Sequence, residues 1–298
     1  MPITLDDATD KLRWAKHHFE VLRSQIEPFE QRDAHSISVK VNPQEGKYTF
    51  YVSGIEVPDP DWGLMIGDCL HNARTALDYV IVRLWALVTA QAPGDVERLQ
   101  FPIYNDPKQF ASAVGDRRKE PAFSGYLARI EELQPFNSFN PSVWGYGRGP
   151  SGQDRTPASL PAALDRLSVL DNIDKHRVVH ATWIGARFGG WLNVGQDAPE
   201  GFESIGGGIT MQPLEDGAEV GGWSFQTPLP SNWEPSEVQM KGYFPLHVAF
   251  PDPSPGKGVL EILPWCISAA EAVIEIFRPV FERQEPPLPV TAVRTIRG

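Results

Sequence analysis

The segment from Asp61 to Val88 contains no proline and carries apolar residues at helical spacing along its whole length. Recurrence of apolar residues every three or four positions is typical of an amphipathic helix that buries one side. We therefore predict a long helix here. Its apolar face consists of Ile66, Leu70, Ala73, Leu77, Val80 and Leu84. The residues on the opposite side, which we expect to face solvent, are Asp68, Asn72, Thr75, Tyr79 and Arg83.

Other segments show the same helical periodicity at both ends of the chain. These predicted helices extend from about Leu5 to Glu27, Leu160 to Val179 and Trp265 to Phe281. We also expect one or two short helices between residues 90 and 157, one of them near Phe123–Leu133. Proline lacks a backbone N–H and disrupts a helix interior. We therefore expect Pro28 to end the first helix and Pro279 to bend the end of the last one.

Strand patterns occur in two blocks of the sequence. Ser36–Val41 and Tyr48–Ile55 are separated by turn residues, which predicts a hairpin. The later strand-like runs are His180–Trp183, Gly190–Val194, Gly208–Met211, Gly222–Gln226, Gly242–Phe250 and Gly258–Leu263. Because this order lacks the regular βαβ alternation of a parallel sheet, it predicts an α+β fold, in which a helical bundle packs with an antiparallel β-sheet.

The predicted organisation has two regions that form one compact unit. Residues 1–179 are mainly helical, with the hairpin at about 36–55 and a long loop at about 135–157. Residues 180–283 supply the antiparallel sheet and the C-terminal helix, and residues 284–298 an extended tail.

The chain is acidic, with 27 Lys and Arg against 38 Asp and Glu in 298 residues, a formal net charge of −11. General nucleic-acid or membrane binding is not expected, because such binding needs clustered Lys and Arg or a long apolar span. Two cysteines, Cys69 and Cys266, are too few for a disulfide framework or a cysteine metal site. The N-terminal residues show no secretion signal, so we expect a cytoplasmic protein. The partner that we expect is another protein or a second copy of this chain.

Polar residues lie at the edge of the apolar faces of two predicted helices. They are His71, Arg74 and Asp78 in one helix and Asp171, Asp174 and Lys175 in the other. Charges facing a core need partners nearby. We therefore expect Asp174 or Asp171 to meet Arg74 or His71 across the two helices.

Three interpretations of these residues remain open. The first is a buried ion-pair network that fixes the register of the helices. The second is an acid–base site in which His71 or His176 moves protons and Arg74 binds an anion. The third is a metal site, for which imidazole and carboxylate are suitable ligands; its residues would be His71, Asp78, Asp171 and Asp174. Their spacing matches no known ligand signature, so we assign no metal ligands, and the sequence leaves any cofactor unknown.

The candidate residues form two groups. The catalytic candidates are His71, Arg74, Asp78, Asp174 and His176. The binding candidates are Asn72, Asp171, Lys175, Arg177 and the aromatic loop residues Trp144 and Tyr146.

Four segments resemble a widespread family of uncharacterised bacterial and phage-associated proteins. They are Gly67–Tyr79 (GDCLHNARTALDY), Phe101–Tyr104 (FPIY), Leu133–Phe136 (LQPF) and Asn172–Arg177 (NIDKHR), in the same order and at similar spacing across residues 60–180. At the level of fold alone, a helical bundle with an Arg and a His a few residues apart is similar to the HEPN class of ribonucleases of toxins and phage defence. The first family has no established activity, whereas the second implies a nuclease-like hydrolase of the defence type. The alternative is a non-catalytic interaction module whose buried network is structural.

Overall fold

The computed structural model confirms the α+β class, and it describes residues 3–32, 36–42, 44–89, 99–115, 117, 120–137, 159–176, 182–184, 192–193, 204–209, 215–225, 241–242, 247–250 and 258–283. The helices are α1 (Asp6–Glu30), α2 (Asp61–Thr89), α3 (Pro107–Val114), α4 (Pro121–Glu132), the short 3-10 helix η2 (Pro135–Asn137), α5 (Ser159–His176) and α6 (Val259–Arg283). The strands are β1 (Ser36–Asn42), β2 (Lys47–Ser53), β3 (Thr182–Ile184), β4 (Leu192–Asn193), β5 (Ser204–Ile209), β6 (Glu219–Phe225), β7 (Lys241–Gly242) and β8 (His247–Ala249).

The chain forms two compact units, and the division between them falls within α1, α2 and α6. Unit 1 comprises Met1–Phe19, Met65–Val178 and Leu263–Gly298, and unit 2 comprises Glu20–Leu64 and Val179–Ile262. The predicted hairpin therefore belongs with the strands that follow residue 178, although the sequence places it within the mainly helical region.

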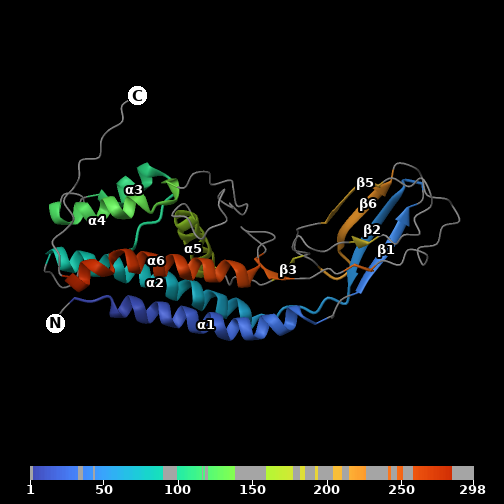
Figure 1. Cartoon of the computed structure of the whole chain (residues 1–298), viewed down its shortest axis with the longest axis horizontal. Coiled ribbons are helices and arrows are strands. Elements are labelled where there is room, and N and C mark those ends of the chain that lie inside the picture. Colours follow the sequence, from blue (N-terminus) through green and yellow to red (C-terminus); the bar gives the residue numbers. More distant parts are fainter. Residues whose placement is uncertain are drawn as a thin grey trace, which may run out of the picture. The chain divides into compact units, whose positions relative to one another are not determined.

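Unit 1 is a helical bundle in which α1, α2 and α6 run alongside one another (Figure 1). Lys11 of α1 hydrogen-bonds Asn72 of α2 at 3.2 Å, and Lys16 pairs with Glu271 of α6 at 2.6 Å. The predicted apolar face of α2 is buried in full: Ile66, Leu70, Ala73, Leu77, Val80 and Leu84 are each at most 1% exposed. Three leucines of α5 are also fully buried: Leu164, Leu167 and Leu170. Burial of these side chains supplies the main favourable free energy of this unit.

Unit 2 contains a four-stranded sheet in the order β1-β2-β6-β5, with antiparallel pairing throughout. The predicted hairpin is present, and Val39 pairs with Phe50 across it. Two smaller antiparallel sheets pair β3 with β8 and β4 with β7. Glu30, at the end of α1, accepts a hydrogen bond from the Val248 N–H at 2.8 Å, so a carboxylate connects this helix end to β8.

Pro28 does not end the first helix, which continues to Glu30. A proline removes only one helical hydrogen bond, and tertiary packing can outweigh that loss near a helix end. Here Phe29 is buried and meets the Trp62 ring edge-on, with ring centroids 4.9 Å apart. This contact and the Glu30 bond keep the last residues helical.

The prediction of a strand at Gly258–Leu263 is wrong, because α6 already begins at Val259. Val259, Ile262, Leu263 and Cys266 are buried at helical spacing. A short apolar run fits a strand or a buried helix equally well, and only packing decides between them. The strand expected at Gly242–Phe250 corresponds to β7 and β8.

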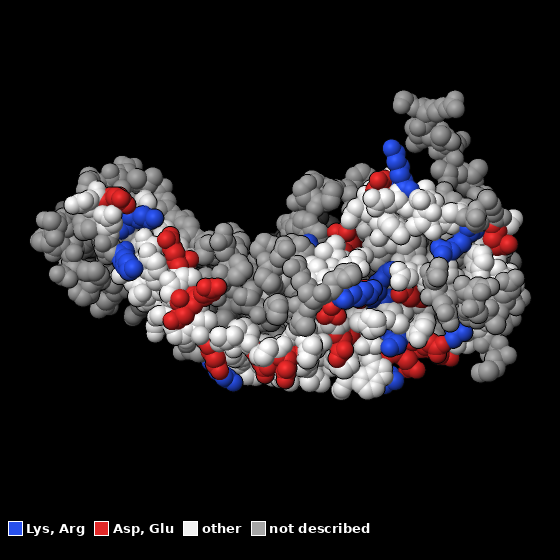
Figure 2. Space-filling model, turned by 180° about the vertical axis from the view of Figure 1, so that it is seen from behind, with Lys and Arg blue, Asp and Glu red and all other residues white. Residues whose placement is uncertain are grey.

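Some expectations lie outside the described residues. These are most of the long loop, with Trp144 and Tyr146, and the tail 284–298. None of the helices in the described part of the chain is long and apolar enough to span a lipid bilayer. On the face shown in Figure 2, the described Lys and Arg residues are scattered among Asp and Glu rather than gathered into one basic area.

Candidate functional site

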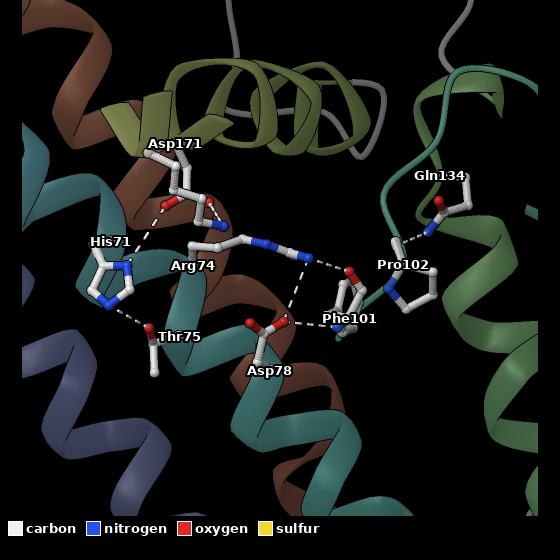
Figure 3. Close-up of polar contacts among 9 residues, drawn as sticks. His71, Arg74, Thr75, Asp78, Phe101, Pro102, Gln134 and Asp171 are labelled. Carbon is white, nitrogen blue, oxygen red and sulfur yellow. Dashed lines mark hydrogen bonds and ion pairs between the residues drawn. The ribbon is translucent and has the colours of Figure 1, made fainter. Parts of the chain in front are cut away.

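Arg74 and Asp78 of α2 both bind the backbone of Phe101 (Figure 3). The Arg74 Nη2 donates to the Phe101 carbonyl oxygen at 2.6 Å, and the Phe101 N–H donates to Asp78 Oδ1 at 2.8 Å. The same two side chains are 3.4 Å apart, one turn along the helix. Because the Arg74 side chain is only 10% exposed, this is a buried clamp on a segment without regular secondary structure.

Arg74 is one of two residues of α2 expected to pair with Asp171 or Asp174 across the helices, but the partners that the structure gives it are Asp78 of its own helix and the Phe101 backbone. The Arg74 Nη1 makes no hydrogen bond within the part of the chain that the structure describes.

Gln134 is a second clamp on the same segment, and sequence analysis does not find it. Its amide is fully buried and donates to the carbonyl oxygens of Pro102, at 2.8 Å, and of Ile130, at 3.0 Å. Its Oε1 accepts from the Tyr104 N–H at 2.9 Å. Its presence in the LQPF segment is the only sequence signal that pointed here. Gln134 and the Arg74–Asp78 pair together hold the FPIY segment in place.

His71 meets Asp171, which confirms one of the contacts expected between α2 and α5. The His71 Nδ1 lies 3.8 Å from Asp171 Oδ1, and Lys175 Nζ lies 2.6 Å from Asp171 Oδ2. The Asp171 side chain is 1% exposed, whereas the His71 ring is 58% exposed. Neither Asp171 oxygen accepts a hydrogen bond of regular geometry from the described residues, so its partners act as counter-charges.

Gly67 allows α5 to approach α2 closely. A Cβ atom on Gly67 would lie 2.7 Å from both Cγ and Oδ2 of Asp174, much closer than ordinary van der Waals contact. Gly67 is one turn before His71 on α2, and Asp174 is one turn after Asp171 on α5. The Gly67–Asp174 and His71–Asp171 contacts therefore follow one another along the interface of α2 and α5. The close approach at Gly67 sets the distance between the helices at His71 and Asp171.

Two carboxyl groups of the site have perturbed acidity. Burial raises the pKa of Asp78, although the nearby Arg74 charge and the Phe101 N–H partly oppose this rise. Burial also raises the pKa of Asp174, and the negative charge of Asp171 adds to the effect, while His71 lowers it. Both shifts reflect the cost of placing a carboxylate where the surrounding protein partly excludes water.

Thr75 joins the site, although the helical wheel places it on the solvated side. Its hydroxyl oxygen lies 3.5 Å from His71 Nε2, so it adjoins the ring nitrogen that does not face Asp171 (Figure 3). Asn72 instead bonds Lys11 and the Asp68 carbonyl oxygen. Arg177 and the side chain of His176 lie outside the described residues.

Within the described ranges, no three His, Cys, Asp or Glu side chains are grouped as ligands of a metal ion would be. The metal alternative thus has no ligand set in that part of the chain. No protein-family model, curated protein or solved structure matches this sequence. The resemblance to bacterial and phage-associated proteins therefore stays a prediction.

Proposed function

We propose that this protein is a hydrolase in which His71 acts as a general base. One observation carries the proposal: a largely exposed imidazole lies next to the fully buried carboxylate of Asp171, 3.8 Å away. A general base must reach substrate, and its orienting group must be held by the fold. The pair meets both requirements.

The two ring nitrogens of His71 have different surroundings. Asp171 faces Nδ1 and favours a proton there, which leaves Nε2 able to accept one from an attacking hydroxyl group. The imidazolium that forms is then stabilised by Asp171. In this mechanism Asp171 orients the base and does not touch substrate.

The charges around His71 limit the substrate. Lys175 is compensated by Asp171. Asp68 and Asp174 pair with no Lys or Arg among the described residues, which leaves two uncompensated negative charges near His71. A phosphate backbone would be repelled there. These charges support a hydrolase of uncharged or cationic substrates over the nuclease-like alternative.

The second candidate is a non-catalytic interaction module. Its support is the clamp, because Arg74 and Asp78 are both engaged with the Phe101 backbone. Groups held in this way stabilise the fold and are not free to bind substrate. The structural interpretation therefore accounts for Arg74 and Asp78, but it does not explain the exposed His71 ring.

A comparison of His71→Gln with His18→Gln tests the proposal. His18 is a half-buried histidine of α1 whose ring lies beside that of Trp14, outside the site. The purified proteins would be assayed with p-nitrophenyl acetate, bis-p-nitrophenyl phosphate and labelled RNA. Loss of a general base lowers the rate by about 100-fold or more. We expect this loss with the acetate ester in His71→Gln, no loss in His18→Gln, and an unchanged melting temperature in both.

Equal rates in His71→Gln and the wild type would refute the role of His71. Absence of hydrolysis by the wild type on all three substrates would support the non-catalytic module. Cleavage of RNA that depends on His71 would instead support the nuclease-like hypothesis.

A further inference from the structure

Three side chains, Asp171, His71 and Thr75, lie in a row where α5 packs against α2 (Figure 3). Asp171 lies next to Nδ1 of His71, and the Thr75 hydroxyl lies next to Nε2 of the same ring. The Asp171 carboxylate is buried, and Thr75 is half-buried. An acid, an imidazole and a hydroxyl in this order are the arrangement that activates a hydroxyl nucleophile.

The contact of Thr75 differs from that of another threonine on the same helix. Thr89 donates its hydroxyl to the carbonyl oxygen of Trp85 at 2.9 Å, four residues earlier, as helical threonines commonly do. The Thr75 hydroxyl instead lies 3.5 Å from the imidazole four residues earlier. Such contacts are often long in the absence of substrate and shorten when it binds.

We infer that Thr75 is the nucleophile of the site and that the substrates are carboxylic esters or related acyl compounds without negative charge. This inference rests on the proposed function, in which His71 is the base. The acyl class follows from the nucleophile and from the charges. A hydroxyl activated by imidazole attacks carbonyl carbon readily, and the uncompensated Asp68 and Asp174 repel anionic acyl donors as they repel phosphate.

The reaction then has two balanced steps. In the first, Thr75 Oγ1 forms a bond to the acyl carbon, its proton passes to His71 Nε2, and the leaving alcohol departs with that proton. In the second, water attacks the acyl-threonine ester, His71 accepts a proton from the water, and Thr75 Oγ1 regains a proton as the carboxylic acid leaves.

The experiment locates the acetyl group after brief reaction with p-nitrophenyl acetate, acetylthiocholine or the anionic ester p-acetoxybenzoate. Tandem mass spectrometry of acid-quenched protein identifies the modified residue. Cys69 and Cys266 do not compete for acetyl groups, because both are fully buried and burial raises the pKa of each thiol to about 12. The variants are Thr75→Val, Thr75→Ser and His71→Gln, with Thr89→Val as the matched control on the same helix.

We expect acetyl on Thr75 with the neutral and cationic esters, and about tenfold less with the anionic one. Labelling should be absent in Thr75→Val, retained on the new hydroxyl in Thr75→Ser, reduced about 100-fold in His71→Gln and unchanged in Thr89→Val. The melting temperature of each variant is measured as well, and an unchanged value excludes unfolding as the cause of lost labelling.

Three results would overturn the inference. Ester hydrolysis that depends on His71 but is unchanged in Thr75→Val would show direct attack by water, so the proposed function would stand without this nucleophile. Hydrolysis unchanged in His71→Gln would remove both. An unlabelled Thr75 in the wild type with every ester would also refute the role of Thr75.

Discussion

Replacement of Arg74 by methionine tests the clamp on Phe101. Methionine keeps the length and apolar stem of the side chain but removes the guanidinium. The variant loses the 2.6 Å bond to the Phe101 carbonyl oxygen and the positive charge 3.4 Å from Asp78. Both losses occur where little solvent can replace them, since Arg74 is 10% and Asp78 24% exposed.

The expected loss follows from these two contacts. A hydrogen bond to a charged group contributes about 1.5–3 kcal/mol, and removing one partner of a buried ion pair costs about 3–5 kcal/mol. Asp78 is partly exposed and keeps its bond from the Phe101 N–H. We therefore expect Arg74→Met to lower the free energy of unfolding by about 3 kcal/mol at neutral pH.

The destabilisation should also depend on pH. Burial raises the folded-state pKa of Asp78 above that of the unfolded chain, so the folded state binds this proton more tightly. The corresponding contribution to stability is present at low pH and is lost as the pH rises through the folded pKa. Arg74→Met removes a positive charge that lowers this pKa. The variant therefore loses more stability than the wild type as the pH rises. We expect the destabilisation to be smaller near pH 4.5 than at neutral pH, because more of Asp78 is then protonated and needs no counter-charge.

Urea unfolding of the wild type, Arg74→Met, Asp78→Asn and the double variant measures this, at neutral pH and near pH 4.5. The double-mutant cycle should give a coupling of about 1–2 kcal/mol between the two side chains at neutral pH. The control is Arg129→Met, which breaks an exposed pair with Glu132 and should change stability by less than about 0.5 kcal/mol. A loss below about 1 kcal/mol that does not vary with pH would refute the buried clamp.

Two further predictions concern contacts that position the site. Gln134→Leu should lower stability by about 2–4 kcal/mol, measured by urea unfolding, because it leaves the Tyr104 N–H and the Pro102 carbonyl without their buried partner; a loss near zero would contradict this. Gly67→Ala should destabilise the wild type but stabilise the Asp174→Ala variant by about 1 kcal/mol, since alanine is the better helix former once the carboxylate is gone; equal effects in both backgrounds would show that Asp174 does not press on Gly67.

The sequence alone determined the elements whose pattern is local. The apolar face of α2 can be recognised from the spacing of its aliphatic residues, and every predicted core position on that face is buried. The hairpin follows from two strand patterns and the turn between them, and the register of β1 and β2 agrees with it. The polar edge of α2 is also local, because spacing on one helix fixes which side chains share a face.

Only the tertiary structure decided contacts between distant segments. β2 finds its second neighbour in β6, and α6 begins earlier than its apolar run suggested, because packing and not periodicity selects helix over strand there. In the same way, the sequence could place His71 and Asp171 on facing arcs as one of several pairings, but it could not exclude the pairing of Arg74 across the helices.

The remaining parts of the site depend on backbone atoms and on rotamers. Arg74 binds a carbonyl oxygen 27 positions away, and Gln134 binds backbone groups on a segment that has no helical or strand pattern. Backbone groups are the same at every residue, so sequence carries no sign of which one a side chain will meet. Thr75 illustrates the same limit: its position on α2 was predictable, but its contact with the His71 ring depends on the orientation of that ring, which lies beside Asp171 of another helix.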